Sequence, residues 1–310
     1  MGAVHSRGPV AAIDCGTNST RLLLVDDRGR TLERQMRITR LGQGVDATGV
    51  LADEAVDRCV DVLTGYGEVL RRHGVARGRL VATSAVRDAA NGEEFLARAA
   101  RASGLVPEVL TGDEEGRLSM AGATVGLEPP PGPWLVVDIG GGSTELIAGR
   151  SAEDPSLAVV SMQMGCVRIA ERFFHADPPT ADELAAARAM VDSELDRAVA
   201  AHPGLATGIR LIGLAGTVAT LASLDQGLAI YERERVHHAV LSAATVARWH
   251  RTLAAETGVE RLRRPGMDPG REDVIVGGTL VLEAVMDRFG FGECLVSESD
   301  ILDGLVASQR

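Results

Sequence analysis

The stretch VVDIGGGSTEL, residues 136–146, decides how the second half of this chain folds. An apolar run typical of a buried strand ends at Asp138, and three glycines and two hydroxyl residues follow. Glycine is costly to order, so three in succession behind a buried strand indicate that something approaches the backbone closely. Because apolar residues resume at once, the pattern predicts two strands joined by a glycine turn.

A related pattern stands near the start of the chain. Residues 14–19 (DCGTNS) and 138–143 (DIGGGS) share the order Asp, any residue, Gly, two small residues and a hydroxyl residue, each between two apolar strands. We call these the first and second glycine turns. The repeat predicts two similar α/β domains, and the Pro-rich stretch 129–133 places the boundary between residues 1–130 and residues 131–310.

The spacing of apolar residues predicts the helices between these strands. A stripe of Val56, Val60, Leu63 and Leu70 indicates a helix over 53–72. Capping patterns open two more helices, with Asn91 and Glu94 before a helix to about 103, and Thr180 and Glu183 before a helix over 180–200. Further helices are expected at 113–126, 217–224, 242–257, 272–289 and 300–308.

Composition excludes several classes of function. The net charge of −11 and the pI of about 5.2 leave no broad basic field for nucleic acid or a membrane surface. We find neither an apolar signal region nor an apolar run long enough to cross a bilayer. The four cysteines are widely spaced, which favours neither a disulfide framework nor a metal cluster and fits a cytoplasmic location.

Glycine turns suit anions because successive N–H groups can point into one concavity. The residues expected to bind phosphate are Gly16, Thr17, Asn18, Ser19, Gly140, Gly141, Gly142, Ser143 and Thr144. The alternative is a pair of ordinary β-hairpins with flexible glycines. Neither the P-loop pattern nor the dinucleotide-binding pattern is present, since a strand rather than a helix follows the glycines.

A third glycine turn, residues 213–217, lies between a strand and a helix. N–H groups at a helix start bind anions, which makes Gly216 and Thr217 further candidates, although close packing of helix on strand explains the glycines equally well. His237 and His238 are expected to point in opposite directions on a strand and to bind no metal.

The segment LTGDEEGRL, residues 110–118, offers a candidate catalytic group. Thr111 and Glu114 match a capping box, whereas Glu115 has no such task and could orient a water molecule. The alternative is that both glutamates only complement the helix dipole. Arg21 and Arg87 have the planar guanidinium that suits a transferring phosphoryl group, and a solvated surface role is the alternative for each.

Five segments in order resemble motifs of the exopolyphosphatase/guanosine pentaphosphate phosphohydrolase (Ppx/GppA) family, in the actin, sugar kinase and Hsp70 superfamily. They are AAIDCGTNSTRLLL, ATSAVRDAANGEEFL, LTGDEEGRLSMAGA, VVDIGGGSTEL and MGCVRIAERF. The resemblance implies two ribonuclease-H-like domains with a cleft between them. It also implies hydrolysis of the terminal phosphoanhydride of inorganic polyphosphate or of the 5′ γ-phosphate of pppGpp.

The same resemblance assigns roles to residues of this chain. Glu115 matches the family's catalytic glutamate, and Arg21 and Arg87 match its phosphate-contacting arginines. Asp138 and Glu145 match its metal-associated acids, with Asp14 the corresponding acid of the first turn, so Mg²⁺ or Mn²⁺ is the expected cofactor.

Two departures from the family pattern bear on the substrate. Long members carry an additional C-terminal helical domain, whereas this sequence ends at Arg310, and residues 301–304 (ILDG) lack the arginine of the usual LREG-like segment. Both favour short polyphosphate. A regulatory binder of (p)ppGpp and a nucleotide-binding sensor stay open as alternatives, and the apolar helices after residue 215 suit a core or a homodimer interface equally.

Overall fold

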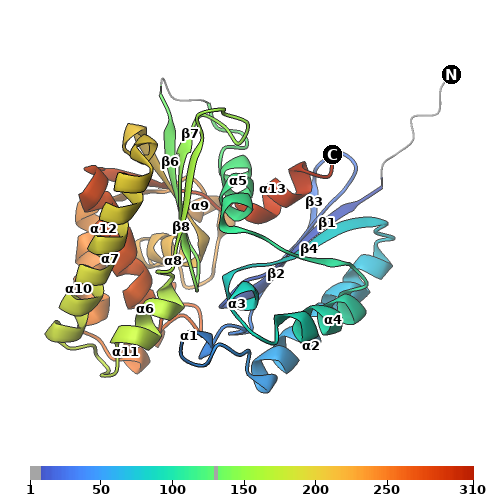
Figure 1. The fold of residues 1–310 in the computed structure, drawn as a ribbon, viewed down its shortest axis with the longest axis horizontal. Helices are drawn as coiled ribbons and strands as arrows, with labels where there is room; N and C mark the ends of the chain where they lie inside the picture. Colours follow the sequence, from blue (N-terminus) through green and yellow to red (C-terminus); the bar gives the residue numbers. More distant parts are fainter. Residues whose placement is uncertain (1–7, 129–131) are drawn as a thin grey trace. The chain divides into compact units, whose positions relative to one another are not determined.

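A computed structural model describes residues 8–128 and 132–310 of the chain. The chain forms two compact units: unit 1 ends at Thr111 and includes Ile301–Arg310, and unit 2 is Gly112–Asp300. Each unit has one sheet flanked by helices, which confirms the predicted α/β class (Figure 1).

Unit 1 has a five-stranded sheet in the order β3-β2-β1-β4-β5. The first three strands are antiparallel neighbours, and β4 runs parallel to β1, as β5 does to β4. Its elements are β1 Val10–Cys15, β2 Ser19–Val25, β3 Thr31–Ile38, α1 Val45–Thr48, α2 Asp53–Arg72, β4 Arg77–Ala82, α3 Ser84–Arg87, α4 Gly92–Ser103, β5 Pro107–Val109 and α13 Ile301–Ala307.

The alternation of side chains along β1 separates the core of unit 1 from its polar site. Ala11, Ile13 and Cys15 enter the core beneath α2 and α4. Because successive side chains of a strand point to opposite faces, Asp14 lies on the other face. Helix α13 packs against β1, β2 and β4.

Unit 2 has a six-stranded sheet in the order β10-β11-β9-β6-β7-β8. It repeats the antiparallel triplet as β6, β7 and β8, with β9 parallel to β6. Its elements are α5 Gly112–Ala123, β6 Trp134–Ile139, β7 Thr144–Gly149, β8 Ala158–Met162, α6 Cys166–Phe173, α7 Ala181–Ala201, a 3₁₀ helix Pro203–Thr207, β9 Arg210–Leu214, α8 Ala215–Asp225, α9 Arg233–Val236, β10 Val240–Ser242, α10 Ala243–Ala254, α11 Gly258–Leu262, α12 Ile275–Phe289 and β11 Glu293–Val296.

Strand β6 separates two cores in the same way. Leu135, Val137 and Ile139 join the large cluster formed with α7, α8, α10 and α12. Trp134 and Val136 pack with Met120 and Ala123 of α5 on the opposite face. Asp138 continues that second series, so the alternation places its carboxylate on the face that α5 covers.

The division between the units differs from the predicted one. Residues 129–131, which span the expected boundary, lie outside the described residues, and the division instead falls between Thr111 and Gly112. Helix α5 belongs to unit 2 because it packs on β6, β7 and β8, and α13 belongs to unit 1 because it packs on β1 and β2. Hydrophobic packing, which Pro-rich composition does not report, sets both assignments.

Local capping predictions fared unequally. Thr180 and Glu183 form the predicted capping box of α7, but the Asn91 side chain makes no cap, because its amide pairs with the backbone of Leu51.

The prediction that His237 and His238 lie on a strand and point in opposite directions was wrong. Both residues follow α9, and their rings stack with centroids 3.7 Å apart. Among the described residues, every helix is too short or too polar to cross a membrane.

Replacement of Leu305 in α13 by alanine should destabilise unit 1. Leu305 is fully buried, and removing its buried methyl groups leaves a cavity that costs about 2–5 kcal/mol. Urea denaturation followed by circular dichroism measures the effect. Val106→Ala, at a side chain that is 82% exposed in the same unit, is the control and should shift the midpoint little. Equal shifts in both variants would contradict the packing of α13 on this sheet.

Candidate active site

The second glycine turn is held by the start of α6. The N–H groups of Cys166 and Val167 donate to the carbonyls of Gly140 and Gly141, both at 2.9 Å. These N–H groups belong to a helix start, where no acceptor exists within the helix itself. The turn's carbonyls therefore face α6, and the N–H groups of Gly141 and Gly142 have no backbone acceptor among the described residues. Such N–H groups form an anion-binding concavity.

The first glycine turn is held by the chain that follows β3. The N–H of Gly16 donates to the carbonyl of Ser19 at 3.0 Å, and the carbonyl of Thr17 accepts from the N–H of Gly42 at 2.8 Å. The carbonyl of Asn18 accepts two further N–H groups, those of residues 39 and 40. The carbonyls of Thr17 and Asn18 therefore accept hydrogen bonds from within unit 1. Both turns thus have the backbone orientation that binding of anions requires.

Asp138 and Glu145 are direct cross-strand partners in the β6–β7 hairpin, so their side chains share one face. Both are buried, with 8% and 1% of their surface exposed. Each accepts a serine hydroxyl at 2.6 Å, Asp138 from Ser119 of α5 and Glu145 from Ser161 of β8. Carboxylates that accept such bonds are held in a fixed rotamer.

Helix α5 carries Glu115 to this face. Glu115 precedes Ser119 by four residues, a spacing that places both on one side of a helix. Since Ser119 reaches Asp138, Glu115 lies on the side of α5 that faces the hairpin acids. Asp113 points elsewhere and pairs with Arg117 on the exposed side. The capping box of Thr111 and Glu114 stays a prediction.

Unit 1 pairs two of its predicted site residues with each other. Asp14 and Arg21 are cross-strand partners, and the Nη2 and Nε of Arg21 donate to Oδ2 of Asp14 at 2.5 and 3.1 Å. Arg87, at the end of α3, donates from Nη1 to the carbonyl of Leu110 at 2.7 Å. The first turn thus has a guanidinium two residues beyond it, fixed by a buried carboxylate.

The third glycine turn opens α8 as predicted, beside an arginine that the sequence did not indicate. A Cβ added at Gly216 would stand 1.4 Å from Nη1 of Arg271, so this guanidinium lies directly on the turn. The buried Nε of Arg271 makes no hydrogen bond among the described residues and lies 3.4 Å from the Asp268 carboxylate. A largely buried guanidinium with an unsatisfied buried nitrogen is suited to bind an anion.

The second and third turns converge on the start of α12. A Cβ at Gly278 would stand 2.1 Å from Oγ1 of Thr217, and one at Gly277 would stand 2.9 Å from the carbonyl oxygen of Cys166. Only glycine permits α12 to approach the starts of α6 and α8 so closely. Arg168 of α6 adds a second guanidinium, whose Nε donates to the carbonyl of Gly142 at 2.9 Å.

The acids of unit 2 fit a hard divalent cation. Asp138 and Glu145 supply adjacent carboxylate oxygens, the ligand type that Mg²⁺ and Mn²⁺ prefer. The described residues contain no cluster of three acidic, histidine or cysteine side chains suited to a metal, so water and phosphate oxygens would complete the coordination. Asp14 fits less well, because Arg21 occupies its Oδ2.

The structure therefore adds to the predicted site without assembling all of it. Within unit 2 it brings together Asp138, Glu145 and the glycine turns, and within unit 1 it joins Asp14 to Arg21. Sequence reasoning missed Ser119, Ser161, Arg168 and Arg271. The spacing from Glu115 could have indicated Ser119, whereas Ser161 and Arg271 come from distant segments and carry no local signal.

Comparison with known proteins is consistent with this geometry. The model of the Ppx/GppA phosphatase family matches residues 23–309. The chain is 42% identical to Exopolyphosphatase 2 of Mycobacterium tuberculosis, over 96% of this chain and 98% of that protein. A crystal structure of an exopolyphosphatase-like protein superposes with a TM-score of 0.90 at 36% identity, over 97% of this chain and 98% of that one. An Aquifex aeolicus Ppx/GppA enzyme superposes with a TM-score of 0.80 at 33% identity, over 97% and 99%.

The cysteines near the turns should be unreactive. Burial raises the pKa of the Cys166 thiol to about 11, and a hydrogen bond with Cys59 together with burial raises the pKa of Cys15 well above its usual value. All four cysteines are buried. Titration of the native protein with a disulfide reagent at pH 8 should therefore detect almost no fast-reacting thiol, and titration in guanidinium should detect four. Rapid modification of Cys15 or Cys166 in the native protein would contradict this.

Proposed function

Because this chain belongs to the Ppx/GppA phosphatase family, we propose that it is an exopolyphosphatase, which hydrolyses the terminal phosphoanhydride of inorganic polyphosphate and releases orthophosphate. The observation that carries the proposal is the arrangement of α5 on the β6–β7 hairpin. Glu115 precedes Ser119 by one helical turn, and the hydroxyl of Ser119 donates to Asp138 at the end of β6, which supports a role for Glu115 beside these acids.

Glu115 acts as the group that orients the attacking water and accepts its proton. A carboxylate in the first turn of α5 can align water in line with the leaving oxygen. In unit 2 the backbone N–H groups of the second and third glycine turns and the guanidinium of Arg271 bind phosphate oxygens of the substrate. In unit 1, Arg21 and Arg87 keep the phosphate-contacting role that the family resemblance implies. A divalent cation held by Asp138 and Glu145 supplies further charge neutralisation when bound.

We propose short polyphosphate as the preferred substrate. The chain has a net charge of −11, so a long polyanion gains nothing from its overall field. Anion binding therefore depends on local donors, which serve a few phosphate groups.

We also propose a cytoplasmic location for the enzyme, because its four free cysteines fit a reducing compartment.

A substrate panel tests the proposal directly. The purified chain with Mg²⁺ should release orthophosphate from polyphosphates of defined length, with the highest kcat/KM for short chains, and EDTA should abolish the release. Equal amounts of pppGpp and ATP are the comparison substrates.

The outcomes of this panel separate the alternatives. Faster release from pppGpp than from every polyphosphate would replace the proposed substrate with a guanosine nucleotide. Stoichiometric binding of pppGpp or ppGpp without turnover of any substrate would indicate a regulator and would end the enzymatic proposal.

Substitution Glu115→Gln should lower kcat by about a hundredfold or more, the usual contribution of a general base, with KM changed little. The reason is that glutamine keeps the size of the side chain but cannot accept the proton. Asp113→Asn is the matched control, since it removes one negative charge from the same helical turn at a 58% exposed side chain. Activity that survives in Glu115→Gln, or an equal loss in Asp113→Asn, would exclude Glu115 from this role.

A further inference from the structure

A buried arginine lies outside the residues described so far and joins three separate segments of unit 2. Only 3% of the surface of Arg261, in α11, is exposed. Its Nη2 donates to Oδ1 of Asp177 at 2.5 Å, its Nε donates to the carbonyl of Glu256 at 3.1 Å, and its Nη1 donates to the carbonyl of Glu272. We call Arg261 with these three acceptors the Arg261 brace.

The third acceptor of the brace connects it with the candidate site. Glu272 is the residue directly after Arg271, whose guanidinium lies on Gly216. Both belong to residues 263–274, an irregular connection between α11 and α12. The carbonyl of Glu272 accepts the bond from Arg261, and the carboxylate of the same residue accepts the N–H of Gly270 at 2.6 Å. The backbone on both sides of Arg271 is therefore fixed from within α11 and the connection itself.

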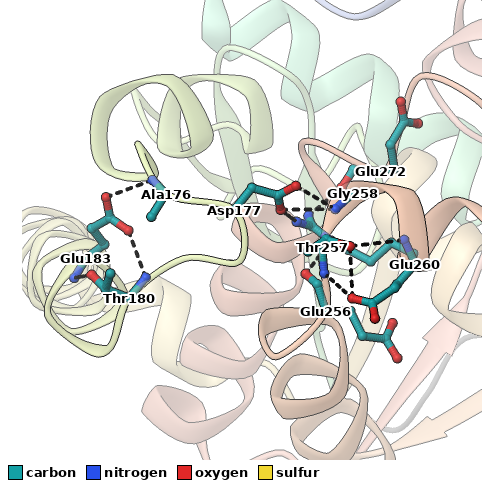
Figure 2. Close-up of polar contacts among 10 residues, drawn as sticks. Ala176, Asp177, Thr180, Glu183, Glu256, Thr257, Gly258, Glu260 and Glu272 are labelled. Carbon is teal, nitrogen blue, oxygen red and sulfur yellow. Dashed lines mark hydrogen bonds and ion pairs between the residues drawn. The ribbon is translucent and has the colours of Figure 1, made fainter.

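The first acceptor joins the brace to the chain that leaves α6. Asp177 follows α6, whose start holds the second glycine turn. Its two carboxylate oxygens also accept the N–H of Gly258 at 3.0 and 2.8 Å, as Figure 2 shows. On the other side of this loop, Glu183 accepts the N–H groups of residues 176 and 180 (Figure 2) and also that of residue 175. Asp177 is thus held from both directions.

Two capping motifs fix the helices from which these groups extend. Thr257 and Glu260 form a complete capping box at the start of α11, and Thr180 and Glu183 form another at the start of α7 (Figure 2). The first part of the connection is anchored independently, because Arg264 pairs with Glu256. In the second part, the N–H of Arg271 donates to the carbonyl of Asp268 and its carbonyl accepts the N–H of Ile275, and the brace adds a side-chain contact at the next residue, Glu272.

Stability alone gives little reason for this arrangement. A buried ion pair is often no more stabilising than apolar side chains of the same volume, and such groups can serve to specify one conformation. Here the three nitrogens of the guanidinium reach Asp177, Glu256 and Glu272, and the last of these is the sequence neighbour of Arg271.

We propose that Arg261 and Asp177 are positioning residues, which touch no substrate and set its affinity by holding Arg271 over the third glycine turn. The proposal rests on the proposed function, in which Arg271 binds phosphate. It predicts a change in KM rather than in kcat, because the water-orienting Glu115 lies on a different element, α5.

A double-mutant cycle tests this dependence. Asp177→Asn removes the charge and keeps an acceptor for Gly258, and its half-exposed side chain makes misfolding a small risk. With a short polyphosphate, Asp177→Asn and Arg261→Lys should each raise KM about five- to tenfold with kcat within about twofold of the parent, a typical coupling between residues in one network. In the Arg271→Ala background, the same substitutions should change KM less than about twofold. Arg263→Gln, an exposed arginine of the same connection, is the control and should leave both constants unchanged.

The readings of this cycle are distinct. The proposal is overturned if Asp177→Asn and Arg261→Lys raise KM by the same factor in the Arg271→Ala background as in the parent protein. It is also overturned if neither substitution changes KM in the parent. Thermal melting by circular dichroism identifies a variant that fails to fold, in which case the other variant decides. If the parent protein releases no phosphate, the proposed function fails, and calorimetric binding of tripolyphosphate in the same cycle still tests the brace.

Discussion

The site depends on how the carbonyl groups of the glycine turns are satisfied. A buried carbonyl without a hydrogen bond is costly, so a tight turn at the end of a buried strand needs donors nearby. In unit 2 the start of α6 supplies them, and in unit 1 the chain after β3 does so. With the carbonyls of the second turn bound, the N–H groups of Gly141 and Gly142 have no backbone acceptor among the described residues and keep a fixed direction. The positive end of the α6 dipole strengthens the preference of the second turn for an anion.

Local sequence pattern predicted the strands around these turns well. A buried strand ending in Asp and followed by Gly and hydroxyl residues has few other solutions, and both hairpins were confirmed. The same local reasoning failed for the division of the chain. Helix α5 follows unit 1 in sequence but packs on unit 2, and α13 follows unit 2 but packs on unit 1. Which sheet a helix covers is decided by tertiary packing, and the apolar spacing of the helix alone does not contain it.

The candidate site shows the same limit at the level of single residues. Asp138, Glu145 and the glycines were predictable because strand and turn fix their spacing. Arg271 was not, because its place over Gly216 arises from an irregular connection that is held by long-range contacts such as the bond from Arg261 to the carbonyl of Glu272. Asn91 had the pattern of a helix cap, yet its amide was taken by the backbone of Leu51, a competing long-range bond.

An acidic protein can bind a polyanion only where its own charge is locally reversed. Each unit reverses it with the same two components, backbone N–H groups at a glycine turn and an arginine close to that turn. In unit 1 the arginine is fixed by a carboxylate, Asp14, which also neutralises part of its charge. In unit 2 the Nε of Arg271 makes no hydrogen bond among the described residues, and the brace acts on the neighbouring backbone instead of on the guanidinium. Positioning through the backbone adds no further carboxylate to the ion pair that Arg271 makes with Asp268, whose carboxylate lies 3.4 Å from its Nε.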